Sequence, residues 1–506
     1  MNHLVIAPLL LPLLAGIVLL LLRPLPLSQR RLLSLAAVLA LVVMAIMLLL
    51  EVADGSVWVY ALGNWPAPYG IVLVLDRLAA LMLLTTSLLA LFALLYACRG
   101  TDLAGRHFHV LFQLQLFGLN GAFLTGDLFN LFVFFEVLLL ASYGLLLHGS
   151  GKRRTRAGLH FVVINLAGST LFLFAVGTLY GVLGSLNMAD LAVRLEGLAP
   201  ADRGVAEAAG LLLFVVFALK AALIPLHLWL PAAYASTSAP VAALFAIMTK
   251  VGAYAILRLD TLIFGAGAGA SAHLLDPWLL PLALATLAIG MLGAIASTAL
   301  RQQLAYLVVA SVGSLLVAFG LGTEAAIAAG LYYLPHSTFA AGAFFLLADS
   351  IVIRRGDMDD RFQANAAMTE RRLLGGYFFV LAVITVGLPP LSGFLGKFLT
   401  LRAALGHPAE AWVFAVVLGG GLLGLIALAR SGSVMFYRAY RPAHALKTPG
   451  SRLVVELAPL SALVLLSLAM TVWAEPIHRY ALDTAEQLLG GADYIRAVLP
   501  NRGGLQ

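Results

Sequence analysis

The sequence is poor in charge and in cysteine. Only 11% of its 506 residues are Asp, Glu, Lys or Arg, whereas 62% are hydrophobic. Water-soluble globular proteins carry about a quarter charged residues and about half apolar ones, so a soluble protein and a large soluble catalytic domain are both excluded. The single cysteine, Cys98, excludes disulfides within the chain and the thiolate clusters that hold metals or iron–sulfur centres.

Motifs for cofactors are also missing. The chain has no Walker motif and no paired-histidine spacing for heme or metal, and the glycine run at residues 265–270 follows no strand that would make it a nucleotide site. We therefore expect no cofactor and no metal. Energy for any activity must then come from an ion gradient or from partner subunits.

Long hydrophobic runs fill the chain instead. At roughly 20 apolar residues per membrane crossing, they predict about fourteen transmembrane helices, because they are too long and too uniform for outer-membrane strands. The first run lacks a basic start and a cleavage site, so we interpret it as a retained helix rather than a signal peptide. The runs cover residues 3–22, 32–50, 71–97, 108–126, 128–147, 159–184, 207–230, 238–259, 277–299, 303–322, 325–349, 373–404, 411–436 and 453–473.

The net charge of +7 is typical of basic cytoplasmic loops in a membrane protein, rather than of nucleic-acid binding. If the N-terminus lies outside, most Lys and Arg fall in inner loops, and acidic residues such as Asp190 and Asp202 fall outside. This assignment leaves Arg258 in an outer loop. It predicts a multi-pass protein of the bacterial inner membrane with both termini on the periplasmic side.

Four ionisable residues lie deep inside predicted spans: Glu136, Lys220, Lys250 and Lys397. A charge at the bilayer centre costs at least ~2.5 kcal/mol, so such residues carry functional information. One alternative is a structural buried ion pair, but four groups on four helices favour an ion pathway. Burial lowers the proton affinity of a lysine and a nearby carboxylate restores it, so a Glu136–Lys220 pair whose separation changes would act as a proton switch.

Prolines interrupt two of the spans. Pro225 follows Lys220, and Pro389 and Pro390 precede Lys397. Proline breaks the helical hydrogen bonding, and freed backbone in a membrane must face protein or water. A discontinuous helix beside a central charge is typical of transporter ion sites, whereas an ordinary proline kink is the alternative.

The breaks also indicate a repeat. Spans four to eight and nine to thirteen form two sets of five, each with its broken helix in fourth place, and an odd number of crossings inverts the second set. The predicted fold is therefore an all-α polytopic membrane protein with two inverted five-helix repeats. We divide it into an N-terminal three-helix segment (1–107), the first repeat (108–262), the second repeat (263–436) and a C-terminal helix with an outer tail (437–506).

Polar side chains between the lysines are candidate connectors. Histidine relays protons near neutral pH, although buried histidines also serve as packing residues. Residues near span ends, Asp76, Arg77, Asp127 and Asp349, are expected at the interface, and Asn165, Ser169 and Thr170 either line a cavity or join helices. The connectors we select are His336, with His227, Tyr306, Ser311, Ser337 and Thr338 as possible relay residues.

Three stretches carry a family resemblance: residues 123–147, 218–258 and 387–398. They resemble the antiporter-like family shared by respiratory complex I and the multisubunit Mrp-type monovalent cation/proton antiporters, and the resemblance covers the whole chain. The motif TGDLFN just before Glu136 is most similar to the D-type branch of the Mrp assemblies.

The resemblance implies a role for each matched residue. Glu136 matches the glutamate of the fifth helix, Lys220 its partner on the broken seventh helix, and Lys250 a relay lysine on the eighth. Lys397 matches the broken-helix residue of the second half-channel, and His336 a histidine of the eleventh helix. Some relatives have a lysine one turn after that histidine, where this chain has Ala340.

Two functions therefore remain open at this point. The first is a proton-translocating subunit of a multisubunit Na+ or K+/H+ antiporter, working with other antiporter subunits in a hetero-oligomeric membrane complex. The second is a proton-pumping membrane subunit of a complex I-like quinone reductase or hydrogenase. In the first case the chain is a secondary transporter subunit and not an enzyme.

Overall fold

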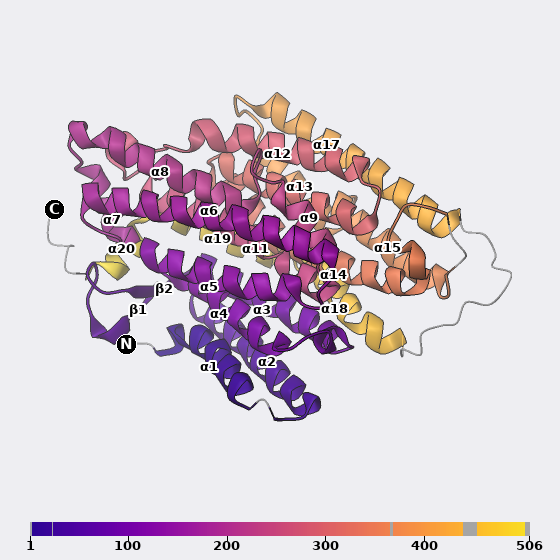
Figure 1. Ribbon diagram of the computed structural model, residues 1–506. Coiled ribbons are helices and arrows are strands. Elements are labelled where there is room, and N and C mark those ends of the chain that lie inside the picture. Colours follow the sequence, from indigo (N-terminus) through magenta and orange to yellow (C-terminus); the bar gives the residue numbers. More distant parts are fainter. Residues whose placement is uncertain (1–2, 23, 365–367, 439–452, 501–506) are drawn as a thin grey trace.

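The computed structural model describes residues 3–22, 24–364, 368–438 and 453–500. Its helices lie side by side in one elongated bundle, and α1 (Ala7–Leu21) starts at the same end of the bundle where α20 (Ala492–Val498) ends (Figure 1). Eleven helices of the described part are long and apolar enough to cross a membrane, and α1 and α4 (Phe108–Leu124) are shorter apolar helices. With one further broken helix these elements account for the predicted spans, so the predicted fold class is confirmed.

The N-terminal segment contains a short hairpin between its second and third spans. Strand β1 (Trp58–Ala61) pairs with β2 (Val72–Leu75) in antiparallel register, with Trp58 opposite Leu75. Directly after β2, the Asp76 carboxylate accepts a hydrogen bond of 2.9 Å from the amide of Ala79 and caps the next helix. The helices of this segment are α1, α2 (Leu27–Glu51) and α3 (Arg77–Ala97).

The first set of five spans is broken in its fourth member. Helix α8 ends at Ala221 and α9 begins at Trp229, on either side of Pro225, as predicted. The fifth span is also interrupted, between Phe245 and Met248, where the sequence contains no proline to signal it. The elements are α4, α5 (Leu128–Leu147), α6 (Lys152–Leu183), α7 (Met188–Glu196), α8 (Pro200–Ala221), α9 (Trp229–Ser236), α10 (Ala239–Phe245) and α11 (Met248–Arg258).

The second set repeats this order. Its fourth member is broken between Val386 and Ser392, around Pro389 and Pro390. Gly387 leaves the first half in a left-handed conformation, with φ of 81°, which glycine adopts without strain. The elements are α12 (Asp276–Ala296), α13 (Leu300–Gly320), α14 (Glu324–Arg355), α15 (Arg371–Val386), α16 (Ser392–Ala403) and α17 (Glu410–Gly432). Single turns of 3₁₀ or π type lie at His3–Val5, Leu62–Asn64, Thr101–Leu103, Leu259–Ile263, Gly269–Ser271, Gly356–Met358 and Ser433–Tyr437.

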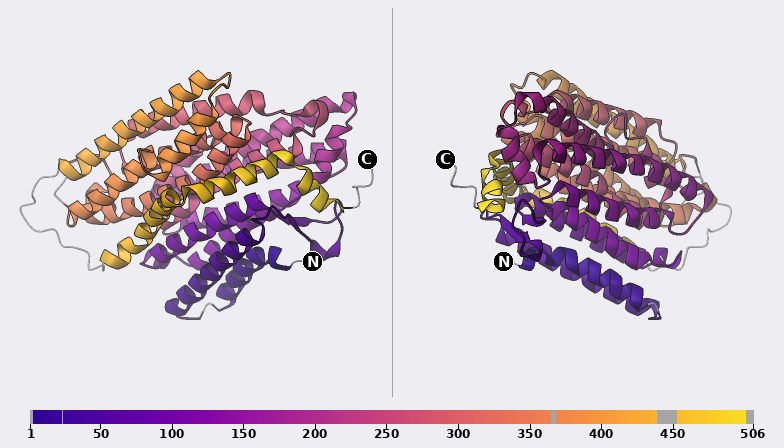
Figure 2. Two further views of the ribbon diagram at one scale, coloured as in Figure 1. Left: turned by 180° about the vertical axis from the view of Figure 1, so that it is seen from behind. Right: turned by 60° about the vertical axis from the view of Figure 1, so that its left-hand side comes forward.

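The C-terminal helices form a brace along one side of the bundle. Helix α18 (Leu453–Val472) is followed at once by α19 (Ala474–Gly490), and both lie across the outside of the other helices (Figure 2, left, yellow). The Tyr332 hydroxyl of α14 donates to the carbonyl of Met470 at 2.8 Å. At the other end of the brace, the Tyr480 hydroxyl donates to the carbonyl of Arg77 at 2.9 Å. The brace therefore joins the second repeat to the N-terminal segment.

An ion pair is buried at the end of the bundle near α20. Arg258 lies 2.5 Å from Asp76, and its guanidinium also faces the rings of Tyr254 and Tyr494 at 5.3 Å. Arg258 is 5% exposed and Asp76 is 1% exposed. The prediction that placed Arg258 in an outer loop is wrong, because Arg258 belongs to α11 and is buried against Asp76. Asp76 lies at the start of α3, the span end where the sequence predicts it, and its charge is paired inside the bundle. Asp127, by contrast, caps α5 by accepting from the amide of Asn130.

A second buried cluster lies at the opposite end. Glu456 of α18 is fully buried, 2.7 Å from Arg354 of α14 and 3.2 Å from Arg99 beyond α3. Nearby, Asp349 accepts a hydrogen bond of 2.9 Å from the Tyr96 hydroxyl, so this carboxylate is also part of the interior. The cluster joins three helices that are distant in the sequence.

Replacing Glu456 with Gln removes the charge that compensates two arginines. Because breaking a buried ion pair typically destabilises by about 3 kcal/mol or more, we expect a clearly lower unfolding temperature in detergent. The matched control is Glu475→Gln, whose side chain is 81% exposed beside Arg479 and whose loss should change stability by roughly 0.5 kcal/mol or less. Equal unfolding temperatures for both variants would contradict the stabilising role of the cluster.

Candidate functional site

Glu136 lies in the middle of α5 and is bound to α6. Its carboxylate accepts a hydrogen bond from the Ser169 hydroxyl. The residue is only half-buried, and it shares a helix face with Val133 and Leu140, which are 39% and 64% exposed. An acidic group therefore lies beside an apolar surface of the bundle.

Lys220 lies in the last turn of α8, next to the helix break, and is 5% exposed. Its ammonium group donates to the side-chain oxygen of Asn165 at 3.2 Å. Backbone groups freed by the break are satisfied from neighbouring helices, since Trp229 donates to the carbonyl of Leu219 and Thr286 accepts from the amide of Ile224. The lysine is thus held at an opened helix end whose polar backbone remains paired.

Glu136 and Lys220 are not in contact with each other. Among the described residues, no ion pair within 4.0 Å joins them. Asn165 and Ser169, which bind them, are four residues apart and therefore on one face of α6. Helix α6 mediates between the acid and the lysine, a role that sequence reasoning left undecided between cavity lining and helix joining.

Lys250 is fully buried in the first turn of α11, directly after the interruption that follows α10. Its ammonium group donates to the Ser311 hydroxyl of α13 at 3.3 Å. The α11 helix packs tightly on the end of α8, because a Cβ at Gly252 would lie 2.4 Å from the amide nitrogen of Ala221. Lys250 therefore faces the second repeat from within the first.

A small cavity continues the path from Ser311. It has a volume of about 20 Å3, and its polar lining comes from Ser311, Tyr333, His336, Ser337 and Thr385. This volume is sufficient for one water molecule with polar partners. Ala340, which stands where some relatives have a lysine, also lines it. Ser311 of α13 and His336 of α14 thus face the same space.

His336 connects the cavity to the second broken helix. Its Nδ1 lies 2.9 Å from the Ser392 hydroxyl at the start of α16. Further along α16, Lys397 donates to the carbonyl of Val386 at 2.6 Å, which is the last residue of α15 and lies at the break. Here the lysine itself satisfies a carbonyl that the interruption of the helix has freed.

The remaining relay candidates divide into two groups. His227 is buried between α8 and α9 and its Nδ1 has no partner among the described residues. Tyr306 lies outside the small cavity and lines instead a polar cavity of about 1000 Å3 with Arg153, Asp359 and Arg430. Ser337 and Thr338 both donate to the carbonyl of Leu334 in their own helix, and only Ser337 reaches the small cavity.

The sequence alone does not identify Ser392 as a site residue, and it does not identify Asn165 as the hydrogen-bond partner of Lys220. Ser392 is the second residue after the Pro389–Pro390 pair and begins α16. The proline pair that predicts the break therefore also predicts that Ser392 lies at a helix N-terminus. Its contact with His336 spans 56 residues, and no spacing within one helix reveals such a contact.

Comparisons with known proteins agree with this geometry. The family model described as NADH:quinone oxidoreductase/Mrp antiporter, TM, matches residues 125–423. The chain is 42% identical to a probable K(+)/H(+) antiporter D subunit of Rhizobium meliloti (99% of this chain, 98% of the relative) and 38% identical to a Na(+)/H(+) antiporter D subunit of Alkalihalophilus pseudofirmus (99% and 100%). A chain of the Mrp complex from a Dietzia species superposes with a TM-score of 0.88 at 30% identity, covering 99% of this chain and 100% of that one.

The contact between His336 and α16 depends on Gly393. A Cβ at this position would lie 2.2 Å from the carbonyl of Ile384 and 2.9 Å from the imidazole of His336. Helix propensity alone predicts that Gly393→Ala stabilises the protein by about 1 kcal/mol. We expect the opposite sign, a loss of roughly 1–3 kcal/mol, because a backbone carbonyl cannot move away without opening the break.

Thermal unfolding of the purified chain in detergent measures this change. The matched control is Gly419→Ala in α17, where an added Cβ meets no atom within 4 Å and the ordinary helix preference should apply. A Gly393→Ala variant that is as stable as the control would show that the close approach of α16 to His336 is absent in solution.

Proposed function

The chain belongs to the NADH:quinone oxidoreductase/Mrp antiporter family, and we propose that it is the proton-translocating D subunit of a multisubunit Na+ or K+/H+ antiporter. The observation that carries this proposal is the polar path buried between the two repeats. It runs from Lys250 through Ser311 and a cavity of about 20 Å3 to His336 and Ser392. In a multi-pass membrane protein such a path is expensive, and proton transfer is the chemistry that its lysine, hydroxyl and imidazole groups share.

In the first half, Glu136 and Lys220 act as a switch through α6. In the structure, Ser169 holds the acid and Asn165 holds the lysine. A shift of α6 that brings the carboxylate to Lys220 favours the charged lysine, and their separation favours loss of its proton. Lys220 lies beside a helix end opened at Pro225, where small movements change its surroundings.

In the second half, protons pass laterally from Lys250 to Lys397. The Ser311 hydroxyl and one water in the small cavity connect Lys250 to His336, and Ser392 connects His336 to α16. Lys397 ends the path at the carbonyl of Val386, at the break around Pro389 and Pro390. The two repeats, residues 108–262 and 263–436, then form two half-channels joined by this axis.

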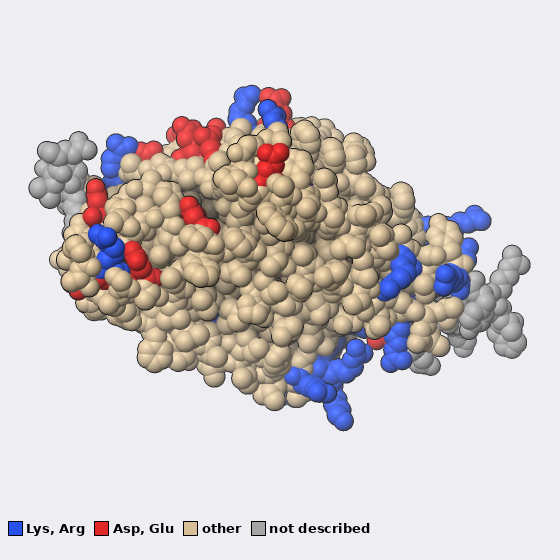
Figure 3. Space-filling model, turned by 90° about the horizontal axis from the view of Figure 1, so that it is seen from above, with Lys and Arg blue, Asp and Glu red and all other residues tan. Residues whose placement is uncertain are grey.

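The chain acts as a transporter subunit rather than an enzyme, within a hetero-oligomeric complex of antiporter subunits. The half-buried Glu136 on an apolar surface supports a partner, because a carboxylate facing lipid costs several kcal/mol. We further propose the bacterial plasma membrane with both chain termini outside. Figure 3 supports this orientation, since Lys and Arg predominate at the right-hand end and the lower edge, whereas most visible Asp and Glu, with some Lys and Arg among them, lie toward the left and top.

Replacing Glu136 with Gln tests the proposal directly. The variant keeps the shape of the side chain but loses its charge, so the switch cannot retain a proton on Lys220. We expect cation-dependent proton movement in everted vesicles from antiporter-deficient cells to vanish, while the subunits still assemble. The vesicles carry this chain alone, its full operon, or the operon with Glu136→Gln.

The control for this experiment is Glu324→Gln, an exposed glutamate at the start of α14, which should transport normally. We expect this chain alone to be silent. Transport by an assembled Glu136→Gln complex would refute the switch. Proton pumping only upon addition of a reductant, by a complex that exchanges no cation, would favour the redox-complex function.

The water in the small cavity gives a second prediction. Ser311→Val removes the hydroxyl and fills the space, so we expect the exchange rate to fall by about a hundredfold or more, as for the loss of a positioned proton-transfer group. Ser311→Ala leaves room for additional water and should retain more activity than Ser311→Val. The rates are measured in the same vesicles, and Thr338→Val, which lies outside the cavity on α14, is the control. A Ser311→Val variant with an unchanged rate would exclude this lateral path.

A further inference from the structure

A separate polar cavity lies at the opposite end of the bundle from the hairpin, where α1 and α2 meet the turn between α3 and α4. It has a volume of about 420 Å3. Its charged and polar lining comes from Arg30 of α2, Asp102 of the connecting turn, Arg106, and His109 of α4. None of these residues belongs to the polar path between the repeats, so the proposed transport function does not account for the cavity.

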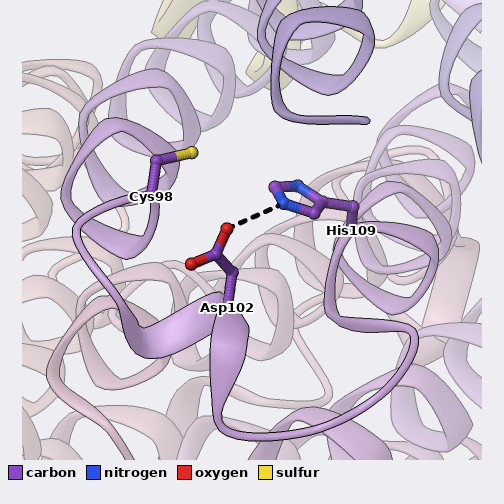
Figure 4. Close-up of side chains that lie close together, drawn as sticks. All are labelled: Cys98, Asp102 and His109. Atoms are coloured by element: carbon purple, nitrogen blue, oxygen red, sulfur yellow. Dashed lines mark hydrogen bonds and ion pairs between the residues drawn. The ribbon is translucent and has the colours of Figure 1, made fainter. Parts of the chain in front are cut away.

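Two residues of its wall, together with a cysteine beside it, have the composition of a metal site. Cys98, Asp102 and His109 converge from the end of α3, the connecting turn and the first turn of α4 (Figure 4), and their ligand atoms lie within 4.8 Å of one another. However, Arg31 donates to both oxygens of Asp102, at 2.6 and 2.7 Å. A guanidinium in this position occupies the carboxylate and repels a cation, so the donor set does not fit a metal.

Arg31 instead neutralises the one carboxylate of the wall. Burial alone would raise the pKa of Asp102, but the hydrogen bonds and charges of Arg31 and His109 outweigh burial and lower this pKa to about 2. Asp102 is therefore an anion at neutral pH and is fully matched by Arg31. Arg30 and Arg106 form no ion pair among the described residues, which leaves the cavity with two uncompensated positive charges.

Hydrogen-bonding groups in the wall also lack partners. The Nε of Arg30 and the Nδ1 of His109 are buried without a hydrogen bond among the described residues, and His109 is 5% exposed. His109 already contacts Asp102 through its Nε2 at 3.2 Å, so Nδ1 is the ring nitrogen that remains for a bound group. Buried polar atoms without partners are rare and require an explanation.

The N-terminus of α4 opens into the same cavity. His107, Phe108, His109 and Val110 all line it, and the helix has no side-chain cap. The first amides of a helix have no acceptor within the helix, and the helix dipole makes this end attractive to anions. Two arginines, an orphaned imidazole nitrogen and an uncapped helix end together form a site for a phosphate group.

The surroundings indicate that this phosphate belongs to a lipid. Leu19 and Leu27 form part of the cavity wall, and the end of α1 exposes apolar side chains, with Leu21 72% and Leu22 43% exposed. Basic pockets at the ends of transmembrane helices suit the headgroups of anionic lipids. We propose that this cavity binds the phosphate of an anionic phospholipid whose acyl chains lie along α1.

Native mass spectrometry of the full chain, purified with the subunits that accompany it, tests the proposal. Phosphatidylglycerol is titrated against phosphatidylcholine, for the wild type and for the double variant Arg30→Gln with Arg106→Gln. We expect the double variant to bind phosphatidylglycerol about tenfold more weakly or worse, because each basic residue contributes substantially to anionic headgroup binding. The matched control is Lys152→Gln with Arg156→Gln, which removes two exposed charges from the start of α6.

The single variant Arg106→Glu controls for a folding defect in the double variant. Arg106 is exposed, so reversing its charge should weaken phosphatidylglycerol binding without loss of structure. The phosphate group in the cavity could come from free inorganic phosphate or from a phospholipid headgroup. Thermal unfolding with added inorganic phosphate distinguishes these two sources. Weaker phosphatidylglycerol binding only in the cavity variants supports the proposal. Equal binding by all variants overturns it, and so does a site that inorganic phosphate stabilises while phosphatidylglycerol does not bind.

Discussion

The structure depends on one constraint: inside hydrocarbon, every polar group must find its partner within the protein. This constraint is visible wherever a helix is interrupted. At the first break, Trp229 and Thr286 complete the hydrogen bonds of Leu219 and Ile224, and neither partner is a titratable group. At the second, the carbonyl of Val386 is completed by Lys397 itself. The two breaks are therefore equivalent in topology but not in chemistry, since only at the second does the lysine bind a backbone carbonyl of the break itself.

This difference gives the two repeats unequal freedom. Lys220 is bound by Asn165 of α6, through the side-chain oxygen at 3.2 Å and the backbone carbonyl at 3.4 Å, and among the described residues it supports no backbone group at its own break. When Lys397 moves or loses its proton, by contrast, its contact with the carbonyl of Val386 changes as well. In the proposed mechanism, a change of protonation at Lys397 therefore acts on the contact between α15 and α16. In the first half, the proposed switch acts through α6, because this helix holds both the acid and the lysine.

The sequence predicts the spans and the proline breaks because both arise from local rules: hydrophobic length, and the missing amide of proline. It also identifies the intramembrane charges, since a buried lysine such as Lys250 is conspicuous in an apolar run. It does not predict which helices those charges meet. The contact of His336 with Ser392 and the burial of Arg258 against Asp76 depend on packing between distant segments. The interruption before Lys250 has no proline to mark it, and the residues around it form no sequence pattern that predicts a break.

The size of the cavity between Ser311 and His336 bears on ion selectivity. A space of about 20 Å3 holds a single water molecule, which is sufficient for a proton because a proton moves by exchange of hydrogen bonds. A sodium or potassium ion, in contrast, carries a shell of several water oxygens, and a space for one water molecule cannot hold this shell. This junction is therefore suited to the transfer of a proton and does not admit a sodium or potassium ion together with its hydration shell.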